Sequence, residues 1–200
     1  MTAPRRRLLV ATGSANKLRE LQRLFGDLPI DLVTLHDLGI TDEAPEEGTT
    51  FEANALQKAR WYADASGEWT LADDSGLEVA ALNGAPGVYT RRYAGPHASD
   101  VQNFEKLLAD MSGALNRDAR FVCTMALVDR ATGSERTFRG ECAGRLTTAP
   151  RGTGGFGYDP IFEVAGRTMA ERTPAEKDAL SHRGRAAALV AAALRSEMRP

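Results

Sequence analysis

Two adjacent carboxylates follow a short apolar run in the segment Leu71-Ala72-Asp73-Asp74-Ser75-Gly76-Leu77. Neighbouring carboxylates repel each other, and each raises the pKa of the other unless a cation, a lysine or several backbone N–H groups lie beside them. The pair therefore predicts a positive group close by, and it is suited to holding a divalent cation. The alternative is a solvated turn that only ends a strand, because Asp, Ser and Gly all favour turns.

A strand-turn-helix pattern near the start of the chain has Lys17 at the mouth of its turn. The apolar run Leu8 to Ala11 breaks at Thr12-Gly13-Ser14, and leucines then recur at helical spacing up to Phe25. A helix that begins there directs its first N–H groups and the positive end of its dipole at the turn, which suits a phosphate. The glycine spacing of a full phosphate loop is missing, so an α/β opening without a ligand is the alternative.

A second pair of acids, Glu46 and Glu47, lies in an acidic loop over residues 42–50 that Pro45 and Gly48 interrupt. These residues are separated from Asp73 and Asp74 by a predicted helix.

The predicted helix after this loop runs from Phe51 to about Asp64. Thr49 and Glu52 have the spacing of a capping box. Asn54 and Lys58 are four residues apart and project from the same side of the helix, where a lysine that faces a cleft would bind phosphate or a carboxylate. A solvated polar stripe is the alternative.

A glycine-rich segment, Gly152-Thr153-Gly154-Gly155-Phe156-Gly157-Tyr158-Asp159-Pro160, surrounds one aromatic side chain. Glycine permits backbone conformations and close approaches that other side chains forbid. An aromatic ring on such a loop can stack against a flat ligand such as a nucleobase. The alternative is a glycine-rich hairpin with Phe156 packed in the core.

The last chemically informative segment contains two predicted helix starts. Thr173-Pro174-Ala175-Glu176 reads as a capping box with proline at the first helical position, and the short helix it begins carries Lys177 and ends near Leu180. Ser181 can cap a terminal helix with His182 and Arg183 in its first turn. Cationic side chains oppose the dipole there, which favours a functional reason for them over simple surface exposure.

The elements that would position these residues alternate between strand and helix. Strands are predicted over 8–11, 30–35 and 69–72, an antiparallel ribbon over 121–128 and 135–142, and a helix after Ser99. This order favours an α/β layer structure with parallel pairing and a ligand crevice at the carboxyl ends of the strands.

Composition sets limits on this interpretation. The chain has 200 residues, 42% of them hydrophobic and 26% charged, with a formal net charge of -2. We expect one compact domain over residues 1–200 and no general attraction to nucleic acid. Cys123 and Cys142 have the spacing of neither a zinc site nor a disulfide scaffold. The apolar run behind Arg5-Arg6-Arg7 is too short for a signal or a membrane span, so we expect a cytoplasmic protein without membrane contact.

The motifs occur in the order found in one family. The blocks are Thr12-Gly13-Ser14-Ala15-Asn16-Lys17, Phe51-Glu52-Ala53-Asn54-Ala55, Ala72-Asp73-Asp74-Ser75-Gly76-Leu77, Gly84-Ala85-Pro86-Gly87, Gly154-Gly155-Phe156-Gly157-Tyr158-Asp159-Pro160 and Ser181-His182-Arg183-Gly184. In this respect the chain closely resembles the inosine/xanthosine triphosphate pyrophosphatases, over about Leu8 to Leu194. Any one block would be poor support, but six in order are specific.

The resemblance implies an elongated α/β fold with a mixed sheet flanked by helices, and two lobes around a central nucleotide-binding cleft. It also implies a homodimer and Mg²⁺-dependent cleavage of ITP, dITP or XTP to the monophosphate and pyrophosphate. Asp74 and Glu46 would hold the metal, and Asp74 would be the general base. A metal-bound Asp is a poor proton acceptor, so Asp73 could share that work.

The remaining roles follow from the same resemblance. Triphosphate would be bound by the turn and helix start together with one lysine of the second helix, Phe156 would stack on the purine, and the other residues would line the nucleotide. These residues are Thr12, Gly13, Ser14, Ala15, Asn16, Lys17 and Lys58 for phosphate, and Ser75, Phe156, Gly157, Tyr158, Asp159, Lys177, His182 and Arg183 for the nucleoside.

Selectivity would come from the oxygen at position six of hypoxanthine and xanthine, which a donor from the His182-Arg183 turn could satisfy and adenine could not. The sequence does not reveal how guanine is refused. Two departures from the family pattern are Ser14, where Asn is common, and Glu47, where a threonine usually precedes the glycine. The second leaves either Glu46 or Glu47 as the metal ligand.

Two other functions fit the sequence less well. One is a pyrophosphatase for other modified or pyrimidine nucleotides. The other is a nucleotide- or RNA-binding module without turnover, although the chain lacks a basic stripe with interleaved aromatics.

Overall fold

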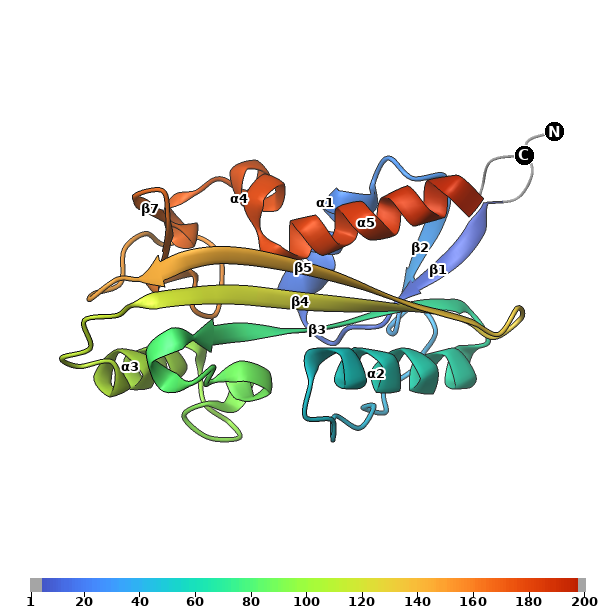
Figure 1. Cartoon of the computed structure of the whole chain (residues 1–200). Coiled ribbons are helices and arrows are strands. Elements are labelled where there is room, and N and C mark those ends of the chain that lie inside the picture. The colour runs from blue at the N-terminus through green and yellow to red at the C-terminus, as the bar shows by residue number, and fades with distance from the viewer. Residues whose placement is uncertain (1–4, 198–200) are drawn as a thin grey trace. The chain divides into compact units, whose positions relative to one another are not determined.

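The structure is a computed structural model that describes residues 5–197, and its strands pair in the order β2-β1-β3-β4-β5-β6-β7 (Figure 1). β1 is parallel to β2 and β3, whereas β5 and β7 are both antiparallel to β6. The predicted α/β class with a mixed sheet is therefore confirmed. The strands are β1 (Arg6–Val10), β2 (Ile30–Thr34), β3 (Trp69–Val79), β4 (Asp118–Asp129), β5 (Ser134–Leu146), β6 (Phe162–Val164) and β7 (Arg167–Thr168).

The helices lie between these strands and at the C-terminal end. They are α1 (Ala15–Phe25), α2 (Phe51–Ser66), α3 (Asp100–Asp110), α4 (Pro174–Leu180) and α5 (His182–Glu197), with short 3₁₀ turns at Ala80–Leu82, Gly87–Arg92, Asp159–Ile161 and Met169–Glu171. The described residues divide into two compact units. The first comprises the described residues up to Asp74, Thr124–Arg139 and those from Ala186 onward; the second comprises Ser75–Cys123 and Gly140–Arg185.

The first unit packs α2 against its strands through small side chains. Ala55, Ala59 and Ala63 recur every fourth residue of α2, are fully buried, and contact Leu9 of β1 and Val128 of β4 in one apolar cluster. Alanines at this spacing put a smooth stripe on the helix and let its backbone approach the sheet closely. In Figure 1, α2 covers one face of these strands, and α1 and α5 lie on the other.

The second unit has a core of larger side chains. Leu77 of β3, Leu107 of α3 and Phe162 of β6 are fully buried in one cluster. Phe121 of β4 meets Phe162 edge to face, with ring centroids 4.6 Å apart, an arrangement that aromatic pairs prefer.

The largest difference between the predicted and the observed secondary structure is the length of β3. The predicted strand ends at residue 72 and is followed by a turn, but β3 continues without a break to Val79. The turn prediction was wrong because it relied on the propensities of Asp, Ser and Gly, and tertiary contacts override such propensities in a strand. The consequence is that the two acids lie inside a strand.

Helix starts were predicted with mixed success. α2 begins at Phe51, so its N-cap is Thr50, whose side chain accepts from the N–H of Ala53; the predicted capping box of Thr49 and Glu52 is wrong. Ser99 is the N-cap of α3, as predicted, and Thr173 forms the predicted capping box with proline at the start of α4. Each correct cap places a hydroxyl where it satisfies an otherwise unpaired N–H.

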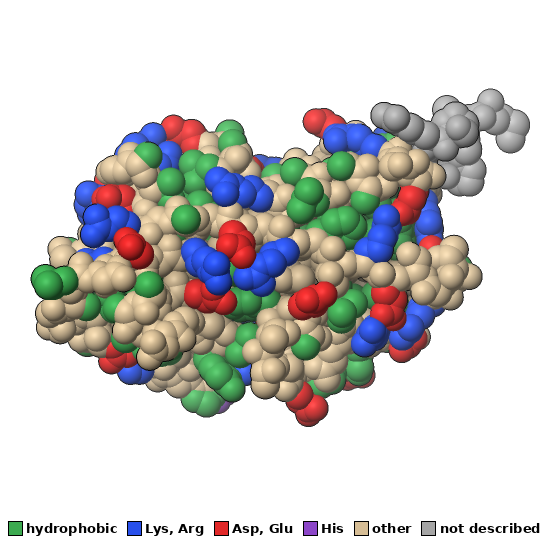
Figure 2. Space-filling view, viewed as in Figure 1, with side chains coloured by type: hydrophobic (Ala, Val, Ile, Leu, Met, Phe, Trp, Pro, Cys, Tyr) green, Lys and Arg blue, Asp and Glu red, His purple; other side chains and the backbone are tan. Residues whose placement is uncertain are grey.

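Charged side chains of both signs lie next to one another on the face drawn in Figure 2. Ion pairs occur in both units, for example Arg60 with Glu135 in the first and Arg120 with Glu78 in the second. Among the described residues, no helix has the length and apolar character needed to cross a bilayer.

Candidate functional site

Asp73 and Asp74 are buried side by side in β3, with 2% and 8% of their surfaces exposed. Successive side chains of a strand point to opposite faces of the sheet, so the two carboxylates leave the backbone in opposite directions. The alternative of a solvated turn is wrong. Burying two carboxylates is costly unless each has its own partners.

The partner of Asp73 is Lys17, in the first turn of α1. The ammonium of Lys17 lies 2.9 Å from a carboxylate oxygen of Asp73, and the pair is largely withdrawn from water. Ser14, the residue that departs from the family pattern, is the N-cap of α1, and its hydroxyl accepts from the N–H of Lys17. The cationic group predicted beside the acidic pair is thus present, and it lies at a helix N-terminus.

The partner of Asp74 is Asn54, on α2. The amide of Asn54 donates to a carboxylate oxygen of Asp74 over 3.0 Å, and both side chains are buried. Burial raises the pKa of Asp74 above its ordinary value, although the Asn54 hydrogen bond and the charges of Lys17 and Lys58 act in the opposite direction. A carboxylate with a raised pKa accepts a proton more readily than an exposed one.

The acidic loop reaches the same region through Lys58 of α2. The Lys58 ammonium forms an ion pair with Glu46 and donates to the backbone carbonyl of Asp73 at 3.2 Å. Burial disfavours its charged form, but the nearby carboxylates of Glu46 and Asp73 prevail and raise the pKa of Lys58. The alternative of a solvated stripe on α2 is therefore wrong for Asn54 and Lys58.

Glu46 and Asp74 are the two carboxylates predicted to hold Mg²⁺. The part of the chain that the structure describes contains no cluster of three or more His, Cys, Asp or Glu side chains arranged to bind a metal. Mg²⁺ commonly takes only one or two protein carboxylates and completes its shell with water and substrate phosphate. The carboxylates of Glu46 and Asp74 are oxygen donors of the kind that such a shared site uses, and the expectation of Mg²⁺ stays a prediction.

In the second unit, Phe156 is held by the residue that follows it by three positions. The carboxylate of Asp159 accepts from the backbone N–H of Phe156 at 2.8 Å. A Cβ on Gly155 would lie 2.0 Å from the same carboxylate, and the φ of Gly155 is +73°. Glycine is required there both by the close approach of Asp159 and by the left-handed backbone.

Two cations flank the ring of Phe156. The ammonium of Lys177 lies 4.4 Å from the ring centroid and 2.6 Å from Asp159, and the Lys177–Asp159 pair is buried. The guanidinium of Arg183 lies 5.8 Å from the same centroid and donates to the hydroxyl of Ser75 at 2.9 Å. Ser75, Phe156, Asp159, Lys177 and Arg183 are therefore brought together.

The other residues predicted to line the nucleoside have packing roles in this unit. The ring of His182 stacks on Phe121, with centroids 4.7 Å apart and planes 12° from parallel. Tyr158 is buried, and its hydroxyl donates to the carbonyl of Thr90. The N–H of Gly157 donates to the carboxylate of Asp100 at 2.7 Å, a contact that fixes the loop from α3.

Comparison with known proteins assigns the chain to a family. The model of the Ham1 family matches residues 8–193. The chain belongs to the Ham1 family.

The resemblance to the inosine/xanthosine triphosphate pyrophosphatases that the six motifs indicate is confirmed by curated relatives. The dITP/XTP pyrophosphatase of Mycolicibacterium paratuberculosis is 50% identical over 195 residues, which are 94% of this chain and 95% of that protein. The dITP/XTP pyrophosphatase of Syntrophobacter fumaroxidans is 49% identical over 181 residues, 90% of this chain and 78% of that protein.

Solved structures of similar proteins support the same fold. A HAM1 protein from Coxiella burnetii superposes with a TM-score of 0.88 at 39% identity, covering 96% of this chain and 99% of that one. A nucleoside-triphosphatase / dITP/XTP pyrophosphatase from Mycobacterium abscessus gives a TM-score of 0.74 at 46% identity, with 92% and 97% covered. The Ham1 fold is thereby established for this chain.

Within this Ham1 chain, the predicted site residues fall into two sets. The first unit unites Lys17, Glu46, Lys58 and Asp74, with the turn Thr12-Gly13-Ser14-Ala15-Asn16 directly before Lys17; the second unites the residues around Phe156. The cleft predicted to join both sets stays a prediction, as does the single domain over residues 1–200, whose first four and last three residues lie outside the described part.

Sequence reasoning did not assign roles to several side chains that hold the site in place. Asn54 and Asp100 are the clearest, since each donates to or accepts from a predicted site residue. The four-residue spacing of Asn54 and Lys58 was a usable signal, whereas nothing local relates Asp100 to a loop 57 residues later.

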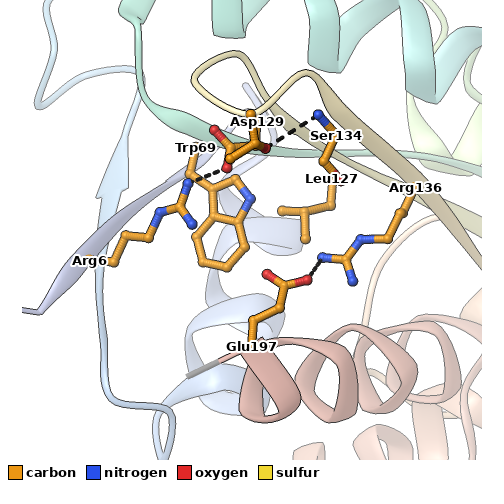
Figure 3. Close-up of a pocket in the computed structure, with 8 residues that line it drawn as sticks. Arg6, Trp69, Leu127, Asp129, Ser134, Arg136 and Glu197 are labelled. Atoms are coloured by element: carbon orange, nitrogen blue, oxygen red, sulfur yellow. Dashed lines mark hydrogen bonds and ion pairs between the residues drawn. The ribbon is translucent and has the colours of Figure 1, made fainter. Parts of the chain in front are cut away.

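A separate cavity of about 310 Å³ lies in the first unit (Figure 3). The charged side chains that line it form ion pairs with one another. A guanidinium nitrogen of Arg6 lies 2.5 Å from a carboxylate oxygen of Asp129, and Arg136 pairs with Glu197. The Arg6 guanidinium also lies 3.9 Å from the centroid of the Trp69 ring. The cavity is lined by Arg6, Trp69, Leu127, Asp129, Thr132, Ser134, Arg136 and Glu197, and this set includes none of the predicted site residues.

Proposed function

We propose that this Ham1 chain hydrolyses deaminated purine nucleoside triphosphates, ITP, dITP and XTP, to the nucleoside monophosphate and pyrophosphate. The observation that carries the proposal is the environment of Asp74, a buried carboxylate of raised pKa under the influence of both Lys17 and Lys58. Relatives that are about 50% identical to this chain are named dITP/XTP pyrophosphatases, and this supports the proposed substrate class.

The two lysines suit a polyanionic substrate. Lys17 and Lys58 each hold a carboxylate in the structure, at Asp73 and Glu46 respectively. A triphosphate would compete for these ammonium groups as a ligand of higher charge, and the N–H groups at the start of α1 would add to its cradle. Residues Thr12 to Lys17 and Lys58 are the phosphate-binding set in this proposal.

Mg²⁺ is the proposed cofactor, held by Asp74 and Glu46. When bound, the metal would neutralise charge on the phosphates and act on the attacking water. For Glu46 to serve as a ligand, its carboxylate must leave Lys58, and the incoming phosphate would take its place on the lysine. The exchange keeps every charge paired, which is what a buried group requires.

Asp74 is the proposed general base. Burial raises the pKa of its carboxyl and a bound cation would lower it; in this proposal the carboxylate still receives the proton of the water that attacks the α-phosphorus. Asp73 is committed to Lys17, and we therefore assign it the part of orienting that lysine. In this proposal the two acids have separate roles: Asp74 accepts the proton and Asp73 orients Lys17.

The nucleobase of the substrate would be recognised by residues of the second unit. Phe156 offers a ring held in place by Asp159, and stacking of a base on such a ring contributes roughly 1–3 kcal/mol. Arg183 is 2% exposed and donates to Ser75, and in this proposal it also donates to the oxygen at position six. His182, Lys177, Gly157 and Tyr158 complete the lining in this proposal.

Partners and location follow from the same family argument. We propose a homodimer that acts on free nucleotides in the cytoplasm, without nucleic acid or membrane as partners.

The decisive experiment is to measure pyrophosphate release across a panel of triphosphates with and without Mg²⁺. ITP, dITP and XTP should be cleaved in preference to ATP, GTP and the pyrimidine triphosphates, and chelation with EDTA should abolish release. Preferential cleavage of a pyrimidine triphosphate, or tight binding of ITP without product, would overturn the proposal.

A further inference from the structure

α2 holds the acidic loop along its length. Proceeding down the helix, Asn54 accepts from the N–H of Gly48, Gln57 accepts from the N–H of Glu47, Lys58 pairs with Glu46, and Tyr62 donates to the carbonyl of Asp42. The loop therefore runs antiparallel to α2 and is fixed by side chains of the helix at each step. A loop that forms no strand or helix hydrogen bonds within itself needs such side-chain partners for its backbone N–H and C=O groups.

Asn54 and Lys58 both join the loop to β3, but Lys58 donates to a backbone carbonyl of the strand, that of Asp73, whereas Asn54 donates to the carboxylate of Asp74. Its amide oxygen accepts from Gly48 at 2.7 Å, two residues after Glu46, while its amide nitrogen donates to Asp74 at 3.0 Å. Asn54 is 2% exposed. One rigid side chain thus connects the loop that carries Glu46 to the strand that carries Asp74.

The chemistry of this position calls for an amide. A carboxylate could accept from Gly48 but could not donate to Asp74, and a hydroxyl is too short to span both. The fit around Gly48 is equally tight, because a Cβ there would lie 2.7 Å from the Asn54 oxygen and 2.8 Å from the Cβ of Ala53. The loop can approach the amide this closely only with glycine at position 48.

We propose that Asn54 is a positioning residue for the metal site, and that it sets the separation of Asp74 and Glu46 to suit a shared divalent cation. This inference rests on the proposed function, since it takes Asp74 and Glu46 as the ligands. Partners that orient metal ligands typically change metal affinity or activity by 10- to 100-fold when they are removed.

The test compares Asn54→Ala and Asn54→Leu with Gln57→Ala. Leucine has the same number and branching of side-chain heavy atoms as asparagine without its hydrogen bonds, so it helps to separate loss of packing from loss of the amide. Gln57→Ala is the matched control, because it frees the neighbouring loop residue Glu47 but has no contact with Asp74. Circular dichroism and denaturant unfolding verify that each variant is folded before any comparison.

Two readouts are needed. The first is Mn²⁺ binding by isothermal titration calorimetry in the presence of inorganic pyrophosphate, which requires no turnover. The second is the Mg²⁺ concentration for half-maximal activity, alongside the KM for ITP at saturating Mg²⁺. Both Asn54 variants should bind Mn²⁺ at least tenfold more weakly and need correspondingly more Mg²⁺, with KM changed less than threefold, and Gln57→Ala should resemble the wild type.

Wild-type metal affinity in both folded Asn54 variants would overturn the proposal, and so would an equal loss in Gln57→Ala. Absence of Mn²⁺ binding to the wild type under these conditions would overturn it as well. If the wild type binds Mn²⁺ but cleaves none of the triphosphates, the proposed function fails while the calorimetric comparison still decides the role of Asn54.

Discussion

Asp73 and Asp74 are consecutive residues of β3, yet their carboxylates bind different helices, Asp73 the Lys17 ammonium of α1 and Asp74 the Asn54 amide of α2. The alternation of side chains along a strand produces this separation. Asp73 is kept in an ion pair with Lys17, whereas Asp74 accepts a hydrogen bond from a neutral amide and also feels the charges of Lys17 and Lys58. The two positions should consequently respond in opposite ways to the same substitution.

Asp74→Asn should abolish most activity and yet stabilise the ligand-free protein. Loss of a general base typically lowers the rate by about 10²- to 10⁴-fold. Burial raises the pKa of Asp74 above its ordinary value in the folded protein, so the folded state binds a proton more tightly than the unfolded chain does. Its favourable contribution to the free energy of unfolding is therefore present at low pH and is lost as pH rises through the folded pKa.

Asparagine cannot ionise, so the variant should exceed the wild type in free energy of unfolding at pH 7, and the difference should shrink toward pH 3. Urea unfolding at both pH values, with pyrophosphate release from ITP, measures the two effects. A variant that is less stable than the wild type at pH 7 would contradict the role of burial, and unchanged turnover would contradict the role as a base.

Asp73→Asn is the natural comparison, and its expected effect on stability has the opposite sign. It removes the carboxylate that holds the largely buried ammonium of Lys17, and hydrogen bonds to charged groups contribute about 1.5–3 kcal/mol. The free energy of unfolding at pH 7 should fall by that amount. If both asparagine variants shift stability in the same direction, the separate environments inferred for the two acids are wrong.

Gly155→Ala and Gly157→Ala separate a steric clash from backbone strain in the Phe156 loop. Both glycines have positive φ, +73° and +63°, but an added Cβ meets Asp159 at 2.0 Å in the first case and nothing within 4 Å in the second. Left-handed backbone costs other residues about 1–2 kcal/mol. Gly157→Ala should lose about that much stability, whereas Gly155→Ala should lose more and also raise the KM for ITP.

Thermal unfolding and ITP kinetics on both variants check this expectation. Equal losses from the two substitutions would show that the contact between Asp159 and the backbone of Phe156 does not restrict the loop.

Lys177→Met tests the buried ion pair beneath Phe156. Lys177 and Asp159 are 6% and 3% exposed and 2.6 Å apart, and removing one member of a buried pair costs about 3–5 kcal/mol because the other charge is left uncompensated. The double variant Lys177→Met with Asp159→Asn should recover part of that loss, since no buried charge then remains. Denaturant unfolding of the two single variants and the double variant measures the coupling, and strict additivity would contradict it.

The residues of the site were more predictable from sequence than the contacts between them. Strand-helix alternation and the spacing of prolines and acids are local, so they pointed correctly to the parallel strands and to α4 with its cap, and the repulsion of two neighbouring acids pointed to a positive group beside them. The path of β3 beyond residue 72 was missed because the local propensities of Asp73 to Gly76 favour a turn.

Long-range hydrogen bonds were also beyond the sequence. Asn54 and Asp74 are 20 residues apart and Asp100 and Gly157 are 57 apart, and no periodicity relates such pairs. For the same reason, the sequence could not decide whether Asn54 and Lys58 of α2 face solvent. The burial of Lys58 depends on the loop that carries Glu46, which is distant in the sequence from the rest of the site.

Phe156→Leu tests whether the nucleobase stacks on this ring. The ring is flanked by Lys177 and Arg183, and leucine keeps apolar bulk without a π-face. Stacking contributes roughly 1–3 kcal/mol per base, so kcat/KM for ITP should fall by about 5- to 150-fold. Inhibition by inorganic pyrophosphate should be unchanged, because that product lacks a base and would occupy only the Lys17 and Lys58 set.

Measuring both quantities on the same preparation separates base recognition from phosphate binding. A parallel loss of pyrophosphate inhibition would mean that the substitution disturbs the protein generally. Full kcat/KM for ITP with leucine in place would mean that the base is held without a stacked ring, and the role assigned to Phe156 would then have to be abandoned.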